Sequence, residues 1–402
     1  MAAHSPCFAL TQSLSMQAEK PVAAAASAGS AGAVAERFAK KHLAAHAAQW
    51  AQGTLQPRAL FEAAGAEGLL GFQVPHQRGG FGLTFEDMAQ LLRILAGTDF
   101  GAAMALVNSH NVALLLLRYS AEALAPRLLP GLLSGQTVAC TALTEPDTGS
   151  DLSQLKTLAV STDEGWLISG EKTWIINAAH ADGVVVYAQT NSGAGVKGMA
   201  AFWVDAHAPG FKRQPLATSG AFNSMGLGGF VLNQVFCTHE QMLCPPGVAF
   251  ADIMDGINRA RTYVAAMCCG MVAQALATAS AYGQERQAFG KPLAQHQGWR
   301  WQLAQAATAL KAGDLLVADA CIRIDQGADV QAEAAQAKLY ATSMAQTQLG
   351  ALLHAMGAEG FLDPYPFCRH LAAAHAAALA DGSTAMLLER VAQDFRIKPG
   401  AN

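Results

Sequence analysis

The 402-residue sequence is poor in charge, since Asp, Glu, Lys and Arg make up only 14% of it and the formal net charge is −4. So little positive charge gives no electrostatic basis for binding nucleic acid or an anionic membrane surface. No run of about 18 uninterrupted apolar residues occurs, so the sequence predicts no membrane-spanning helix. Hydrophobic residues nevertheless make up 52% of the chain, which favours a large buried interior, extensive subunit interfaces, or both.

The sequence also lacks the motifs of several ligand-binding folds. There is no G-x-G-x-x-G after a strand and no G-x-x-x-x-G-K-[ST], which excludes Rossmann and P-loop nucleotide sites. There is no H-E-x-x-H and no Cys/His cluster with metal-ligand spacing, so no metal site is predicted. The eight cysteines form no Cys-x-x-Cys pair and lie mostly in apolar surroundings, as is typical of reduced, buried thiols in a cytoplasmic protein.

Hydrophobic periodicity divides the chain into parts. The Ala/Ser-rich residues 1–33 are interpreted as a flexible tail in preference to an organelle transit peptide, because such peptides are usually Arg-rich and the first Arg is Arg37. Helical spacing, then short β-branched and aromatic runs, then helical spacing again predict an α+β fold with two helical domains around a middle β domain. The predicted domains are 34–137, 138–246 and 247–396, followed by a tail at 397–402.

Two turns contain polar groups whose local sequence leaves their role open. Asp381 lies in the small-residue turn ADGST, just before an apolar helical pattern. Its side chain suits an N-cap, because it accepts backbone N–H groups at the start of a helix, and a catalytic carboxylate is the alternative. The turn TALTEPDTGSDL (141–152) suits a polar, planar ligand edge or a phosphate, but it is also typical of a plain turn.

Six segments, taken in order along the chain, carry a more specific signal. They are VPHQRGGFGL (74–83), LTEPDTGSDL (143–152), GEKTWIINA (170–178), ERQAFGKPLAQHQ (285–297), MGAEGFLDPYP (356–366) and DGST (381–384). From about residue 34 onward the chain thereby resembles the acyl-CoA dehydrogenase family of flavoproteins. The resemblance implies an antiparallel middle domain, a C-terminal four-helix bundle, and FAD held between subunits of a homotetramer or dimer. It also implies an acyl thioester of CoA or a carrier protein as substrate and an electron-transfer flavoprotein as acceptor.

The resemblance assigns roles to individual side chains. Thr144 is expected at the flavin ring and Trp174 against it, whereas Arg286 is expected to reach the ADP part of the cofactor across the subunit boundary. The residues expected at the cofactor are Leu143, Thr144, Trp174, Ile176, Arg286, Phe289, Gln297, His354, Gly357 and Ser383. The residues expected at the substrate are Ser150, Arg261, Asp381 and Gly382.

By the same resemblance, Asp381 is the catalytic base, which removes the α-proton of the thioester while a hydride leaves the β-carbon. Its backbone N–H is expected to polarise the thioester carbonyl together with a ribityl hydroxyl of the cofactor. Helix capping is then a secondary role of Asp381. Some relatives carry the base on the helix beside Arg261, but Ala260 stands there in this chain.

The sequence departs from the family pattern at several positions. Asp381 replaces the usual Glu, Ile176 replaces a Thr or Ser that bonds the flavin ring, and His354 replaces a Gln. Four alanines also replace residues common in the family, namely Ala288, Ala358, Ala372 and Ala373. A base misplaced by about 1 Å can cost roughly a hundredfold in rate, so a short or unusual acyl group is predicted for this shorter carboxylate.

Three functions are therefore considered. The first is α,β-dehydrogenation of a short or unusual acyl thioester. The second is a same-fold flavoenzyme of other chemistry, such as an oxidase, desulfinase or monooxygenase. The third is a non-catalytic member that binds flavin or thioester. Rapid reoxidation of the reduced protein by air separates an oxidase from a dehydrogenase that needs an electron-transfer flavoprotein.

Overall fold

The structure is a computed structural model that describes residues 28–54, 58–120, 122–216 and 220–395. Its first part is helical, as the apolar spacing predicts. The helices are α1 (Ala28–Phe38), α2 (Ala47–Ala51), α3 (Ala59–Ala66), α4 (Phe85–Thr98), α5 (Phe100–Tyr119) and α6 (Ala125–Ser134). Thr84 accepts the Asp87 N–H at 3.1 Å, and Asp99 accepts the Ala102 N–H at 2.7 Å. These caps set where α4 and α5 begin.

Helix α1 corrects one predicted boundary. Residues 28–33, predicted to belong to the flexible tail, form the beginning of this helix. The prediction was wrong there because Ala-rich sequence is typical of tails, whereas Ala31 and Ala35 are buried in the helical core. Residues 1–27 and 396–402, which include the rest of both predicted tails, lie outside the described residues.

The middle part contains an eight-stranded sheet in the order β6-β7-β3-β2-β4-β5-β8, with β1 paired to β4. The strands are β1 (Ala139–Ala142), β2 (Leu158–Ser161), β3 (Gly165–Ile175), β4 (Gly183–Gln189), β5 (Met199–Asp205), β6 (Phe211–Pro215), β7 (Gly228–Thr238) and β8 (Met242–Cys244). Most pairs are antiparallel, as predicted, but β4 pairs in parallel with β1 and, at one position, with β2. The β3–β7 ladder shifts register between Lys172 and Ile175, where Trp174 has a left-handed φ of 58°. Such a bulge changes the direction of the side chain it carries.

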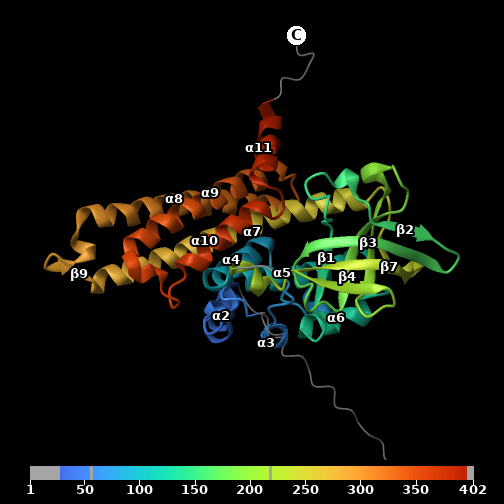
Figure 1. Cartoon of the computed structure of the whole chain (residues 1–402), viewed down its shortest axis with the longest axis horizontal. Coiled ribbons are helices and arrows are strands. Elements are labelled where there is room, and N and C mark those ends of the chain that lie inside the picture. Colours follow the sequence, from blue (N-terminus) through green and yellow to red (C-terminus); the bar gives the residue numbers. More distant parts are fainter. Residues whose placement is uncertain (1–27, 55–57, 121, 217–219, 396–402) are drawn as a thin grey trace, which may run out of the picture.

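The C-terminal part is a bundle of long helices, as the resemblance implies. The helices are α7 (Ala249–Glu285), α8 (Gln297–Asp325), α9 (Gln331–Met356), α10 (Phe367–Leu379) and α11 (Thr384–Ala392). A small hairpin of β9 (Gln287–Ala288) and β10 (Lys291–Pro292) joins α7 to α8. Figure 1 shows this hairpin at one end of the bundle and the sheet beside the other end, with α11 projecting outward.

The helical core accounts for the high apolar content of the sequence. Two unbroken helices, α5 and α7, are long and apolar enough to cross a membrane by length and composition alone. However, in the apolar 18-residue stretch of each helix that meets this criterion, 72% of the residues of α5 and 61% of those of α7 are buried inside the protein. Leu106 of α5, Val264 of α7 and Leu349 of α9 belong to one buried cluster. Of the seven cysteines in the described residues, all except Cys368 are buried, as the sequence predicts.

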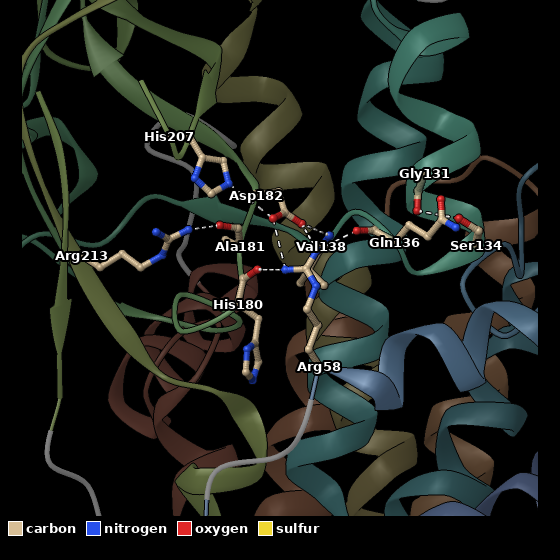
Figure 2. Close-up of polar contacts among 10 residues, drawn as sticks. All are labelled: Arg58, Gly131, Ser134, Gln136, Val138, His180, Ala181, Asp182, His207 and Arg213. Atoms are coloured by element: carbon tan, nitrogen blue, oxygen red, sulfur yellow. Dashed lines mark hydrogen bonds and ion pairs between the residues drawn. The ribbon is translucent and has the colours of Figure 1, made fainter. Parts of the chain in front are cut away.

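Polar contacts around Asp182 join the N-terminal helices to the sheet (Figure 2). Arg58, just before α3, donates from Nη1 to Asp182 Oδ1 at 3.1 Å and to the His180 carbonyl oxygen at 3.0 Å. The Val138 N–H donates to Asp182 Oδ2 at 2.9 Å. Because Asp182 lies immediately before β4 and Val138 immediately before β1, these bonds hold α3 against the N-terminal ends of these two strands.

Candidate active site

The turn between α10 and α11 is held by two buried cations. Arg261 of α7 donates from Nε to the Asp381 carbonyl oxygen at 3.0 Å. Lys338 of α9 donates from Nζ to the carbonyl oxygens of Gly382, at 2.6 Å, and of Ala380. Lys338 is fully buried and Arg261 is 7% exposed. Three consecutive carbonyl groups are therefore fixed around Asp381, whose own φ of 50° is left-handed.

The electrostatics of this turn suit proton transfer. Burial raises the pKa of the Asp381 carboxyl group above its ordinary value, although the positive charges of Lys338 and Arg261 act in the opposite direction. Burial also lowers the pKa of Lys338 to about 8, against the effect of Asp381. A carboxylate whose pKa is brought nearer to neutral pH, beside fixed positive charge, has the properties of a general base.

The predicted capping role of Asp381 was wrong. The N-cap residue of α11 is Ser383, and its side chain makes no capping hydrogen bond. Asp381 lies two residues earlier in a left-handed conformation, so its carboxylate is not used by the start of the helix. Gly382 follows with a φ of 102°, and a Cβ there would lie 3.1 Å from Arg261 Nη2. Glycine therefore allows the turn to pack closely against that guanidinium.

Sequence analysis missed Tyr263 and Asn111, which also lie near this turn. Tyr263 is buried on α7, and burial together with the Asp381 charge raises the pKa of its hydroxyl. Asn111 of α5 donates from Nδ2 to that hydroxyl at 3.3 Å. The only sequence signal for Tyr263 was that it follows Arg261 by two residues on the same helix. The local sequence of α5 gave no signal for Asn111.

The predicted cofactor residues of the β domain lie together. The Thr173 N–H donates to the Thr144 carbonyl oxygen at 3.0 Å, so the segment of Leu143 and Thr144 runs beside the bulge that carries Trp174. Trp174 is 56% exposed, which is unusual for so large an apolar side chain. An exposed indole beside the Thr144 segment suits packing against a planar, polar ring system.

Two further predicted residues flank that surface. Ile176 follows β3 and packs against the helical cluster that contains Ala260 and Tyr263. It therefore connects the β domain to the helices around Asp381. Ser150 is exposed in the turn between β1 and β2, and its proposed contact with the substrate stays a prediction.

A buried ion pair that sequence analysis missed supports the same surface. Lys172 of β3 donates to Glu145 Oε1 at 2.9 Å and to the Leu143 carbonyl oxygen at 3.0 Å. Glu145 also accepts the Thr157 N–H at 2.9 Å. Burial by itself raises the pKa of Glu145, but Lys172 and these hydrogen bonds outweigh it and hold that pKa below its ordinary value. The available signal was a lysine inside a strand, because lysine is almost never fully buried unless it is paired.

Except for Ser383, which is the N-cap of α11 beside Asp381, the remaining predicted cofactor residues lie at the far end of the bundle. Phe289 is 98% exposed in the β9–β10 hairpin, with a left-handed φ of 49°. Arg286 precedes β9, Gln297 begins α8, and both are exposed. A single exposed aromatic side chain does not by itself mark a contact surface, so the role of Phe289 at the cofactor stays a prediction.

The end of α9 lies near that hairpin. Trp299, at the start of α8, donates from Nε1 to the Ala355 carbonyl oxygen at 3.0 Å, which places His354 and Gly357 at the same end. Figure 1 shows that this end of the bundle points away from the sheet that carries Trp174. Within one chain, the predicted cofactor residues other than Ser383 thus form two separate groups, and Ser383 lies in the turn that carries Asp381.

Three family profiles match consecutive parts of the sequence. They are described as acyl-CoA dehydrogenase, N-terminal domain over residues 31–136, middle domain over residues 140–235, and C-terminal domain over residues 250–395. The three matches follow the helix, sheet and helix order of the structure.

Individual proteins are similar over most of their length. The mitochondrial short-chain specific acyl-CoA dehydrogenase of Homo sapiens is 30% identical, over 86% of this chain and 84% of that protein. The structure of butyryl-CoA dehydrogenase from Megasphaera elsdenii is 26% identical with a TM-score of 0.87, covering 92% of this chain and 97% of that one. A structure of PigA with FAD and proline is 26% identical with a TM-score of 0.85, over the same two shares.

Proposed function

Because this chain belongs to the acyl-CoA dehydrogenase family, we propose that it dehydrogenates a short or unusual acyl thioester with Asp381 as the α-proton base. As a family member it is an FAD-dependent oxidoreductase. The observation that carries the proposal is the Asp381 carboxyl group itself. Burial raises its pKa while its backbone is fixed by Arg261 and Lys338, and it caps no helix.

The residues present fit FAD. Trp174 offers an exposed indole on a left-handed bulge, with the Thr144 segment hydrogen-bonded alongside. Arg286 and Phe289 are exposed on the hairpin at the other end of the bundle, where a guanidinium suits a diphosphate and an aromatic ring suits the adenine part. Bound FAD supplies the acceptor for the hydride that leaves the β-carbon.

The protein residues prepare the α-carbon for this reaction. The Asp381 carboxylate accepts the α-proton, and its raised pKa makes it a stronger base than an ordinary aspartate. The Asp381 backbone N–H polarises the thioester carbonyl, where negative charge develops as the proton leaves. Arg261 fixes the turn through its bond to the Asp381 carbonyl oxygen, which keeps base and donor in one fixed arrangement.

The length of the base favours a substrate of limited size. Asp is one methylene shorter than Glu, and hydrogen bonds from Arg261 and Lys338 keep its turn from moving toward the substrate. The α-carbon of the substrate must therefore bind closer to the Asp381 carboxylate. A short or compact acyl group can reach this position most easily. We propose CoA or an acyl carrier protein as the thioester carrier, with Ser150 beside its pantetheine arm.

The proposal also covers the subunit assembly, the electron acceptor and the cellular location. The division of the cofactor residues between two ends of one chain supports a homotetramer, or a dimer, in which the hairpin of one copy reaches the sheet of another. An electron-transfer flavoprotein is the proposed acceptor, and the cytoplasm is the proposed location.

An anaerobic panel of acyl thioesters tests the proposed function. Straight-chain, branched and amino-acyl thioesters, each carried by CoA or by an acyl carrier protein, are mixed with the FAD-loaded protein without oxygen. We expect a short or branched member to reduce the flavin, which is seen as bleaching of its visible absorbance. Bleaching by none of them would leave the non-catalytic alternative.

One specific observation favours a same-fold flavoenzyme of other chemistry as the second candidate. Ile176 offers no side-chain hydrogen bond at the proposed flavin site, where the family usually has Thr or Ser. Mixing the reduced protein with air-saturated buffer separates the candidates. Reoxidation that is slow without an electron-transfer flavoprotein supports the dehydrogenase, and rapid reoxidation supports an oxidase or monooxygenase.

A further inference from the structure

We propose that Lys338 is a positioning residue for α-proton removal, which aims the Asp381 backbone N–H at the thioester carbonyl and fixes the carboxylate beside it. This inference rests on the proposed function, because it assigns a role within the same reaction. Lys338 is 42 residues from Ala380 in sequence and on a different helix, and no motif in the sequence connects the two.

The geometry follows from the planarity of the peptide bond. In a trans peptide the C=O of one residue and the N–H of the next point in opposite directions. Because the Ala380 oxygen accepts from Lys338, the Asp381 N–H points away from the ammonium group. No backbone acceptor in the described part of the chain takes that N–H, so it remains available to a ligand.

The second bond of Lys338 explains why the turn has this shape. The Gly382 oxygen also accepts from Nζ at 2.6 Å, while the Asp381 oxygen between them accepts from Arg261. Consecutive carbonyl groups can alternate in this way because Asp381 has a left-handed φ of 50°. That conformation is unfavourable for a residue other than glycine, and the two cations offset this cost.

A purely structural role explains less of the geometry. A lysine near a helix C-terminus stabilises the last carbonyl groups, and Ala380 is the C-cap of α10. The bond to Gly382, however, lies beyond that cap and across the candidate base. Burying an ammonium group is expensive, and here the burial fixes both residues that flank Asp381.

The charges around Asp381 come from several elements. Lys338 on α9 and Arg261 on α7 both act to lower its pKa. Tyr263 on α7 faces the same carboxylate, Arg390 on α11 acts on Arg261, and Cys268 on α7 faces Lys338. Removing the Lys338 charge should therefore raise the pKa of Asp381 further, while the other groups stay in place.

The test measures proton removal separately from hydride transfer. (Methylthio)acetyl-CoA carries sulfur in place of the β-carbon, so it has an α-proton to lose but no β-hydride. In D2O, Asp381 takes the α-proton and the electron pair of that C–H bond moves to the thioester carbonyl. A deuteron returned by the exchanged carboxyl group then forms a C–D bond, which mass spectrometry detects.

The variants compared are Lys338→Met, which nearly keeps the length of the side chain but removes its charge and both hydrogen bonds, and Thr342→Val on the same helix. Thr342 is buried and donates to the Lys338 carbonyl oxygen at 2.9 Å, so its replacement controls for disturbance of α9. We expect Lys338→Met to slow exchange by about tenfold or more, and Thr342→Val to leave it unchanged. If Lys338→Met does not fold, Lys338→Gln is measured in its place and should also slow exchange.

Steady-state kinetics with the best thioester of the panel add a second criterion. The loss in Lys338→Met should fall on kcat, with KM nearly unchanged, because the interaction matters mainly in the transition state. The acid limb of its pH profile should move to higher pH, as the raised pKa of Asp381 requires. Exchange by wild type and Lys338→Met at equal rates overturns the role of Lys338 alone. Absence of exchange by wild type overturns the proposed function and this inference with it.

Discussion

At the scale of single residues, Asp381 should be essential for chemistry and dispensable for folding. Asp381→Asn keeps the size and polarity of the side chain but cannot accept the α-proton. We expect the variant to fold and to bind FAD, yet to lose flavin reduction by a factor of at least about a hundred. Anaerobic stopped-flow absorbance measures that rate, and Asp381→Glu serves as the control that should retain activity or prefer ordinary linear acyl-CoAs. A near wild-type rate in the Asn variant would contradict the assignment.

The same variant should also show what the half-buried Asp381 carboxylate costs in stability. Burial raises the pKa of Asp381 in the folded state above its unfolded value of about 3.9. Stability that is present below the unfolded pKa is therefore lost as pH rises through the folded pKa. Since Asn does not ionise, Asp381→Asn should have a Tm at pH 7 equal to or above that of wild type. A clearly lower Tm in calorimetry would show that the carboxylate stabilises the fold.

Ile176 gives a second prediction at this scale. Its side chain packs against the helical core and offers no hydrogen bond, whereas a threonine would add a hydroxyl and remove the δ-methyl group. A neutral hydrogen bond is worth about 1 kcal/mol net, so Ile176→Thr should speed flavin reduction modestly or leave it unchanged. Rapid-mixing kinetics with the true substrate measure this. A large loss of rate with FAD still bound would show that the apolar residue is required for a different chemistry.

At the scale of elements, the order of helices and strands could be predicted because the period of the apolar residues changes along the chain. The caps of α4 and α5 and the turn before α11 are also visible in sequence. The bulge at Trp174 is not, because it depends on the register of β3 against β7. The Glu145–Lys172 ion pair and the two hydrogen bonds of Lys338 could not be predicted from the sequence either, because only the fold brings these residues together.

The contact between α3 and the sheet gives the prediction at this scale. Burial alone raises the pKa of Asp182, but hydrogen bonds from Arg58 and Val138 outweigh it, and the pKa lies below its ordinary value. Stability from this group is therefore present above the unfolded pKa of about 3.9 and is lost as pH falls through the folded pKa. Asp182→Asn should lower stability at pH 7 by on the order of 1 kcal/mol and should weaken the loss of stability below pH 4. Urea unfolding at several pH values measures both, and parallel pH curves for the two proteins would contradict it.

At the scale of the whole molecule, the exposed hairpin predicts how the cofactor is retained. Arg286→Ala removes an exposed charge and no core volume, so the fold should be unaffected while FAD is lost more readily. Flavin content after gel filtration, with circular dichroism as the check on folding, measures the effect. Arg300→Ala, an exposed arginine at the same end of α8, is the matched control. Equal flavin content in wild type and Arg286→Ala, or FMN in place of FAD, would contradict the role of the hairpin.

The separation of Trp174 from Phe289 along the bundle has a consequence for concentration. If one flavin is shared by the sheet of one copy and the hairpin of another, release of cofactor and dissociation of subunits become one coupled equilibrium. Mass action then makes added FAD hold the assembly together, and each tenfold rise in free ligand above its Kd adds about 1.4 kcal/mol. Dilution alone should turn the protein colourless, and the colour should return when the separated chains are concentrated again with the released flavin.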